Sequence, residues 1–140
     1  MKVLDFIELI KNILDEQGKS VEVLFDNNVI SQNTFYKYKQ RYPSLKTLFN
    51  IVNYLKVSID YLLEFKDENN FSYYTYDEKT FYENLIKMIK SKNLSQRQFC
   101  RNLNYSRDNI IRWKKGIIPS VQSLLEISQY FGCSIDELLQ

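Results

Sequence analysis

Apolar residues recur along this chain at the spacing of short helices. Phe81, Leu85, Met88 and Ile89 stand three or four residues apart, which places them on one face of a helix. Valine and isoleucine follow the same spacing elsewhere, and no stretch shows the strict alternation of a strand. The pattern therefore predicts an all-α protein.

Polar residues mark where these helices begin and end in the second half of the chain. Ser95, Ser106 and Ser134 each precede a helical run, where a serine oxygen can accept a hydrogen bond from a first-turn N–H. Asn104 suits a left-handed turn, and Pro119 with Ser120 begins another run. These signals predict five helices in this half.

The two halves of the chain repeat one another. The segment PSLKTLFNIVNYLKVSIDYLLE (43–64) overlays PSVQSLLEISQYFGCSIDELLQ (119–140) without a gap. Further upstream, with the offset one residue smaller, Phe6 meets Phe81, Ser20 meets Ser95 and Ser31 meets Ser106. This self-similarity predicts a tandem duplication, with a divergent first domain over 1–66, a linker over 67–77 and a second domain over 78–140.

Charge is unevenly placed along the chain, although the net charge is only +2. Residues 1–66 hold nine basic and eight acidic residues, residues 67–80 hold one and four, and residues 81–140 hold nine and five. The middle stretch therefore is expected to be an acidic linker, and the second half is the basic one.

Composition argues against catalysis. The chain has no histidine, which removes the commonest general base and metal ligand. GKS at 18–20 lacks the glycine spacing of a phosphate-binding loop, and no nucleophile and base are recognisable as a pair. We expect a protein that is not an enzyme, with no cofactor and no metal. Cys100 and Cys133 are expected to be reduced, buried thiols.

The chain is expected to be cytoplasmic. No apolar run approaches the roughly 18 residues that cross a bilayer, so no membrane association is expected. The start, MKVLDFIELI, carries acids within its apolar stretch and is a poor signal peptide.

The segment LSQRQFCRNLNYSRDNIIRWKKG (94–116), followed by IPSVQSLLEISQYFGCSIDELL, resembles the Cro and lambda-repressor-type helix-turn-helix proteins of the XRE family. The first half resembles the family more loosely, through SQNTFYKYKQ (31–40) and KVSIDYLL. The resemblance implies two tandem five-helix lambda-repressor-like helix-turn-helix domains joined by a short acidic linker. It also implies double-stranded DNA as the partner.

In such proteins the second helix of the motif enters the major groove. Ser106, Ile110 and Trp113 are then expected to face inward. The outward positions implied to read bases are Arg107, Asp108, Ile111 and Arg112, and those implied to contact phosphates are Gln96, Asn109, Lys114 and Lys115. Arginine can pair bidentately with guanine, Asp108 can accept from cytosine N4, and Ile111 can touch a thymine methyl group.

The matching positions of the first domain are implied to read bases through Gln32, Asn33, Tyr36 and Lys37, and to contact phosphates through Thr34, Lys39 and Arg41. Several residues depart from the family pattern. Val21 replaces the glutamine that begins the second helix, Asn28 stands where an apolar core residue is expected, and Arg41 replaces a glycine. Tyr36, Tyr38 and Tyr42 crowd this region, and exposed tyrosines suit protein interfaces.

These features favour a sequence-specific DNA-binding transcriptional regulator, as a repressor of phage or mobile-element type. The chain could act as an intrachain pseudo-dimer on half-sites roughly 34 Å apart, or as a homodimer. The alternative is a helix-turn-helix module that binds protein through its aromatic first domain, as an antitoxin or an anti-CRISPR-like inhibitor. The moderate pI of 8.4 and the aromatic first domain favour that alternative. A third hypothesis is a helical oligomerisation domain.

Overall fold

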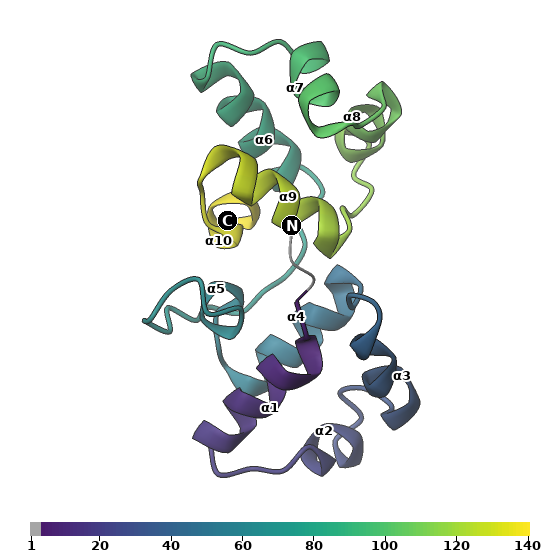
Figure 1. The fold of residues 1–140 in the computed structure, drawn as a ribbon, viewed down its shortest axis with the longest axis vertical. Helices are drawn as coiled ribbons and strands as arrows, with labels where there is room; N and C mark the ends of the chain where they lie inside the picture. The colour runs from purple at the N-terminus through teal and green to yellow at the C-terminus, as the bar shows by residue number, and fades with distance from the viewer. Residues whose placement is uncertain (1–3) are drawn as a thin grey trace. The chain divides into compact units, whose positions relative to one another are not determined.

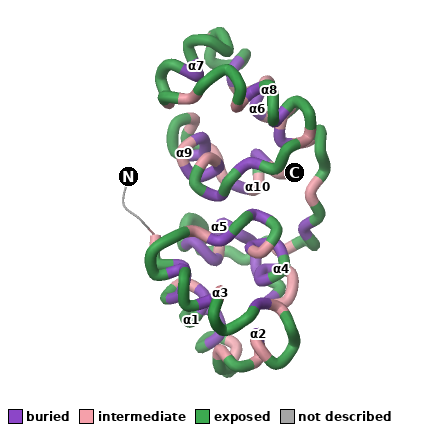
Figure 2. Tube along the Cα trace, turned by 90° about the vertical axis from the view of Figure 1, so that its right-hand side faces the viewer, coloured by how far each residue is buried: buried purple, intermediate pink, exposed green. Residues whose placement is uncertain are grey.

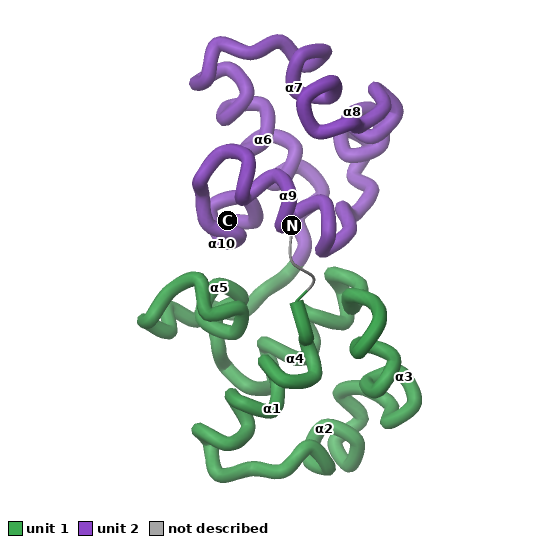
Figure 3. Tube along the Cα trace, viewed as in Figure 1, with its two compact units in different colours: residues 1–75 green, residues 76–140 purple. Residues whose placement is uncertain are grey.

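A computed structural model describes residues 4–140, and every regular element within that range is helical (Figure 1). The all-α prediction is confirmed. The chain divides into two compact units, one ending at Thr75 and the other spanning Tyr76–Gln140 (Figure 3). None of the helices in the described part of the chain is long and apolar enough to cross a membrane.

Each unit has five α-helices within the described residues, as the sequence predicts. Unit 1 contains α1 (Phe6–Glu16), α2 (Glu22–Asp26), α3 (Gln32–Tyr36), the 3₁₀ turn η1 (Lys37–Lys39), α4 (Leu45–Leu55) and α5 (Ile59–Leu62). Unit 2 contains α6 (Thr80–Ser91), α7 (Gln96–Leu103), α8 (Arg107–Lys114), α9 (Val121–Phe131) and α10 (Ile135–Leu139).

The predicted helix boundaries of unit 2 rest on side-chain caps. Ser95 Oγ accepts from the N–H of Gln98 at 3.0 Å, and Gln98 Oε1 accepts from the N–H of Ser95 at the same distance. Ser134 and Glu137 form the same reciprocal pair at the start of α10. Asn104 ends α7 in the left-handed conformation, with φ 59°. Local sequence therefore determines where these helices start and stop.

The apolar faces of the helices point into each unit, and exposed positions lie on their outer sides and in the connecting loops (Figure 2). On α8, Ile110 and Trp113 are buried as predicted. Trp113 packs edge-on against Phe81 of α6, with ring centroids 5.4 Å apart. The predicted inward direction of Ser106 is wrong: it is exposed, because its side chain and N–H both bond to Asn109 Oδ1 at the start of α8.

Matched positions of the two units share local structure. Asn27 of unit 1 donates to the Tyr54 hydroxyl at 3.1 Å, and Asn102 of unit 2 donates to the Tyr130 hydroxyl at 2.9 Å. The helices α4 and α9 both end on a left-handed residue, Lys56 and Gly132. The same tie between the second and fourth helices thus occurs in each unit.

Most of the segment that the sequence suggests as a linker lies against unit 1. We call residues 67–75 the strap. The Asn69 amide accepts from the N–H of Ser58 at 2.8 Å and donates to the carbonyl of Lys56 at 3.0 Å. Tyr74 is buried, its hydroxyl accepts from the N–H of Ile59 at 2.9 Å, and its ring stacks on Phe49. The strap is therefore held by hydrogen bonds and aromatic packing.

Replacing Ile110 by alanine is expected to destabilise unit 2 strongly. Ile110 is 5% exposed, so the shorter side chain leaves a cavity that lowers the free energy of unfolding by about 2–5 kcal/mol. That is a large share of the total stability of a small domain. Thermal or urea unfolding of the full chain measures the effect. Ile117→Ala, at a residue that is 45% exposed, is the control and should cost far less. Equal costs for the two variants would contradict the packing described for α8.

Candidate nucleic-acid interface

The outer face of α8 is open to solvent. Arg107, Asp108 and Arg112 are exposed, and the Ile111 side chain is 47% exposed. Because Ile110 and Trp113 bury the opposite face, the helix cannot rotate about its axis without exposing them. The four residues predicted to read bases therefore share one accessible surface.

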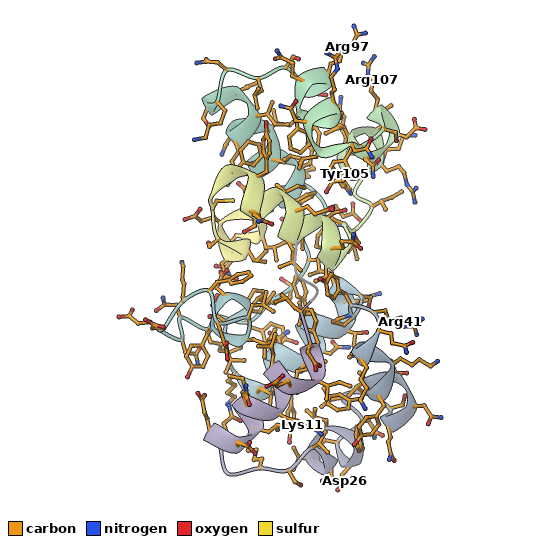
Figure 4. The ribbon with its side chains drawn as sticks, viewed as in Figure 1. Lys11, Asp26, Arg41, Arg97, Tyr105 and Arg107 are labelled. Carbon is orange, nitrogen blue, oxygen red and sulfur yellow. The ribbon has the colours of Figure 1, made fainter. Side chains whose placement is uncertain are left out.

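The N-terminal end of α7 adds polar side chains beside this surface. Gln96 is the first residue of α7 and is exposed, as the predicted phosphate contact requires. Arg97 follows it and is also exposed. Figure 4 shows Arg97 and Arg107 extending outward at the same end of unit 2. Arg97 was not among the residues predicted from the sequence to contact DNA, although its place next to Gln96 was a usable signal.

The C-terminal end of α8 is basic. Lys114 and Lys115 are exposed, and cations at this end complement the helix dipole. The chain then turns at Gly116, whose φ is +95°. A Cβ there would lie 3.0 Å from Glu78 Cβ, so the turn requires glycine. Beyond it, Ile117 and Ile118 are exposed apolar residues that were not among the residues predicted from the sequence.

Asn109, predicted to contact phosphate, is only partly exposed. Its Oδ1 accepts from both the N–H and the hydroxyl of Ser106, at 3.2 and 3.0 Å. This bonding leaves its amide nitrogen as the group suited to a phosphate oxygen. Asn109 thus stabilises the N-terminus of α8, with or without a bound ligand.

Tyr105 fixes the turn between α7 and α8. Its ring lies between Phe99 and Trp113, at centroid distances of 6.1 and 5.7 Å. Its hydroxyl donates to Glu126 Oε1 on α9 at 2.7 Å. Burial, and then the hydrogen bond to Glu126, raise the pKa of Tyr105 above its usual value. No local sequence pattern predicts this contact, because it joins residues 21 positions apart.

Cys100 lies beneath the same turn and is buried, as predicted. Its thiol faces the carbonyl of Ser106, with Sγ and O 3.9 Å apart. Burial raises the pKa of this thiol, and the charge of Arg107 partly offsets the shift. A thiol with a raised pKa is a poor nucleophile. Cys133 is also reduced, but it is only half-buried, contrary to prediction.

The matching surface of unit 1 differs in shape. The helix α3 is only five residues long, and the chain tightens into η1 after Tyr36. Thr34 is half-buried, and its side chain bonds to the cap residue Ser31 at 2.8 Å. The other positions predicted to contact DNA are exposed: Gln32, Asn33, Tyr36, Lys37, Lys39 and Arg41.

Two expectations for unit 1 need correction. Tyr38 is buried and Tyr42 is half-buried against Phe6, so of the three tyrosines only Tyr36, 40% exposed, offers an aromatic surface. Asn28 does not take a core position. It is exposed in a left-handed turn with φ 56°, and Ile30 is buried beyond it. The turn between the second and third helices therefore leaves the polar Asn28 side chain in solvent.

Comparison with known proteins finds a similarity to helix-turn-helix proteins within unit 2. Residues 85–138 match the sequence model of the helix-turn-helix family. A 60-residue stretch is 42% identical to the HTH-type transcriptional activator BcrR of Enterococcus faecalis. That match covers 42% of this chain and 29% of BcrR, so the chain spans under a third of that relative. No solved structure matches the chain.

Replacing Tyr105 by phenylalanine tests whether Glu126 holds the turn. Loss of this partly buried hydrogen bond is expected to cost about 1 kcal/mol of unfolding free energy. The folded-state pKa of Tyr105 lies above the ordinary value near 10. The hydrogen bond's contribution to the free energy of unfolding is therefore complete below about pH 10 and declines as the pH rises further. Thermal unfolding of both proteins between pH 7 and 11 measures this. If the difference in stability between the parent and the variant stays constant above pH 10, the proposed role of the Tyr105–Glu126 hydrogen bond is contradicted.

Proposed function

We propose that this chain is a sequence-specific double-stranded DNA-binding transcriptional regulator that places α8 in the major groove. The observation that carries the proposal is the open outer face of α8. Its N-terminal half presents Arg107, Asp108, Ile111 and Arg112, while Ile110 and Trp113 hold the other face in the core. The groove is about 12 Å wide and admits a helix in this way.

The side chains on this face can discriminate between bases. The planar forks of Arg107 and Arg112 match the O6 and N7 acceptors of guanine, Asp108 can accept from the cytosine amino group, and Ile111 suits a thymine methyl group. The face therefore favours a half-site rich in G·C pairs with at least one thymine.

The residues around this face suit the DNA backbone. Gln96 and Asn109 offer neutral donors, and Lys114 and Lys115 offer charges at the far end of α8. Phosphate contacts fix the register of a protein on the duplex without reading sequence. In this arrangement they flank the reading helix on both sides.

Unit 1 is proposed to take part with its own exposed residues. The amides of Gln32 and Asn33 can pair with adenine N6 and N7, with Tyr36 next to them and Thr34 behind. The two units then act as an intrachain pseudo-dimer with different half-sites. The other arrangement is a homodimer that uses one unit for DNA and the other for pairing. A selected binding site with unlike halves favours the first, and a palindrome favours the second.

The direction of regulation is proposed as repression, by a regulator of phage or mobile-element type. The name of the matched relative describes an activator, so the test must be able to show either sign. A reporter gene placed behind the selected site measures it. Lower output when the protein is present supports repression, and higher output contradicts it.

Replacing Arg107 and Arg112 by alanine is expected to remove most of the sequence preference while leaving the helix content unchanged. Each bidentate pair contributes about 1–3 kcal/mol of discrimination, so two losses should remove most of it. Selection from random duplexes, followed by anisotropy titration, measures this. The control is Lys87→Ala with Lys90→Ala, which removes the same charge from exposed positions of α6. A parent protein that enriches no duplex, yet captures one stoichiometric protein partner, would favour the protein-binding alternative.

Replacing Gln96 by alanine should weaken binding to every duplex by a similar factor, because a phosphate contact carries no sequence information. The preferred site should stay the same. Titration of the selected duplex and of a scrambled duplex compares the two losses. A changed sequence preference would show that Gln96 contacts bases rather than the DNA backbone.

A further inference from the structure

The end of the strap is fixed to unit 1 through both its backbone and a side chain. The N–H of Tyr74 donates to Asn53 Oδ1 on α4 at 2.8 Å, and the carbonyl of Tyr74 accepts from Asn53 Nδ2 at 2.9 Å. The Tyr74 hydroxyl accepts from the N–H of Ile59, and the side chain is 5% exposed. Tyr74 is therefore an anchor of the strap, and Asn69 is another.

The strap also supplies a helix cap that unit 1 lacks. In unit 2 the N–H of Ser134 donates to Glu137 Oε2, within the first turn of α10. In the repeat, Tyr61 stands at the position of Glu137, so α5 has no carboxylate there. The N–H of Ser58, which matches Ser134, donates to Asn69 Oδ1 of the strap instead. The strap therefore satisfies a donor that α5 leaves open.

On the other side, unit 2 holds the chain from Asp77 onward. The Asp77 carboxylate accepts from the N–H of Lys79 at 2.8 Å, and the Asp77 carbonyl accepts from the N–H of Thr80, the first residue of α6. Glu78 lies so close to Gly116 that a Cβ on the glycine would come within 3.0 Å of it. The turn before α6 is thus part of unit 2.

Two residues, Thr75 and Tyr76, remain between these two fixed segments, and we call them the tether. Three Cα–Cα steps of about 3.8 Å lead from Tyr74 to Asp77, and they span at most about 11 Å. If the strap were free after Lys66, eleven steps of roughly 3.3 Å would lead to Asp77 and span about 36 Å. The anchors of the strap therefore shorten the possible reach about threefold.

The length of the tether matters when both units bind one duplex. Two linked binding sites gain affinity from each other only where the linker can span them. The orientation of a second half-site also changes with spacing, because the duplex turns once in about 10–10.5 base pairs. A tether of two residues therefore admits few spacings, whereas a free strap would admit many.

We propose that Asn53, Asn69 and Tyr74 are positioning residues that select the spacing of half-sites. They fix the strap to unit 1, and this sets the length of chain left free between the units. The selection of spacing rests on the proposed function, in the arrangement where both units of one chain bind one duplex. The three residues contact no DNA in this role and act through the tether.

The test inserts Gly-Ser-Gly-Ser at one of two places in the full chain. An insertion between Thr75 and Tyr76 lengthens the tether by four residues, which adds up to about 13 Å of reach. The matched control is the same insertion between Asn70 and Phe71, which lengthens the strap between its anchors and leaves the tether unchanged. If the strap were free, the two insertions would have the same effect. Circular dichroism checks that both variants keep their helix content.

Small-angle X-ray scattering of the free chains measures the tether without DNA. The tether insertion should raise the maximum dimension by up to about 13 Å and broaden the distribution of distances. The strap insertion should leave both close to the parent values. Equal scattering from the two insertion variants would overturn the fixed strap.

Anisotropy titrations measure the accepted spacing on the selected duplex and on a copy with two extra base pairs between its halves. The parent and the strap insertion should bind the altered duplex roughly 100-fold more weakly, because one unit then binds alone. The tether insertion should lose less than about 10-fold, since its longer linker still spans the two halves. A tether insertion that loses as much as the parent would overturn the inference.

Substitution of an anchor gives the same comparison without an insertion. Tyr74→Ala frees the chain after Asn69 and should tolerate the altered spacing better than the parent does. Tyr74→Phe keeps the ring on Phe49 and the backbone pair with Asn53, so it should restore the parent profile. A purely structural role would weaken binding at both spacings by the same factor, and that result would contradict the proposal.

The failure of the proposed function looks different. A parent that enriches no duplex would refute DNA binding and, with it, the selection of spacing. Scattering that still separates the two insertions would in that case sustain the fixed strap and the short tether. A parent with a clear sequence preference, whose tether insertion does not change the accepted spacing, would sustain DNA binding and refute the positioning role.

Discussion

The packing of Trp113 is the interaction on which the rest of unit 2 depends. Its ring meets Phe81 from α6 on one side and Tyr105 from the α7–α8 turn on another. Large aromatic rings contribute most of the burial energy in a small core, so this one residue joins three elements. With Ile110, it determines which side of α8 is hidden and hence which side is offered to a ligand.

A few polar contacts beside this packing restrict the conformation of the start of α8. Ser106, Asn109 and Tyr105 lie within one turn of each other, and each bond they make restricts the start of α8. Preorganisation of this kind matters for recognition, because a helix that must be ordered on binding loses part of its affinity to that cost. Unit 1 lacks the tyrosine of this arrangement, since Ile30 stands at the position of Tyr105. Its third helix has five residues, against eight in α8.

The two units share local features but differ in charge distribution. Both use serine caps, and both tie the second helix to the fourth with an asparagine–tyrosine bond. Unit 2 carries arginines on the exposed face of its third helix, whereas unit 1 carries its cations just beyond that helix. The two units therefore place their cations differently relative to the third helix.

The sequence by itself determined the helices, their caps and the left-handed turns, because these depend on residues within three or four positions of one another. Ser95, Asn104 and Ser134 act as predicted for that reason. The exposed face of α8 was also predictable, since helical periodicity separates Ile110 and Trp113 from Arg107 and Arg112. Tertiary structure decided the rest. Tyr38 is buried while Tyr36 is exposed, the strap is held to unit 1 by Asn69 and Tyr74, and Tyr105 pairs with Glu126. In the strap and at Tyr105 the partner is more than ten residues away, and at Tyr38 the outcome depends on the packing of the whole unit, so no local pattern could specify it.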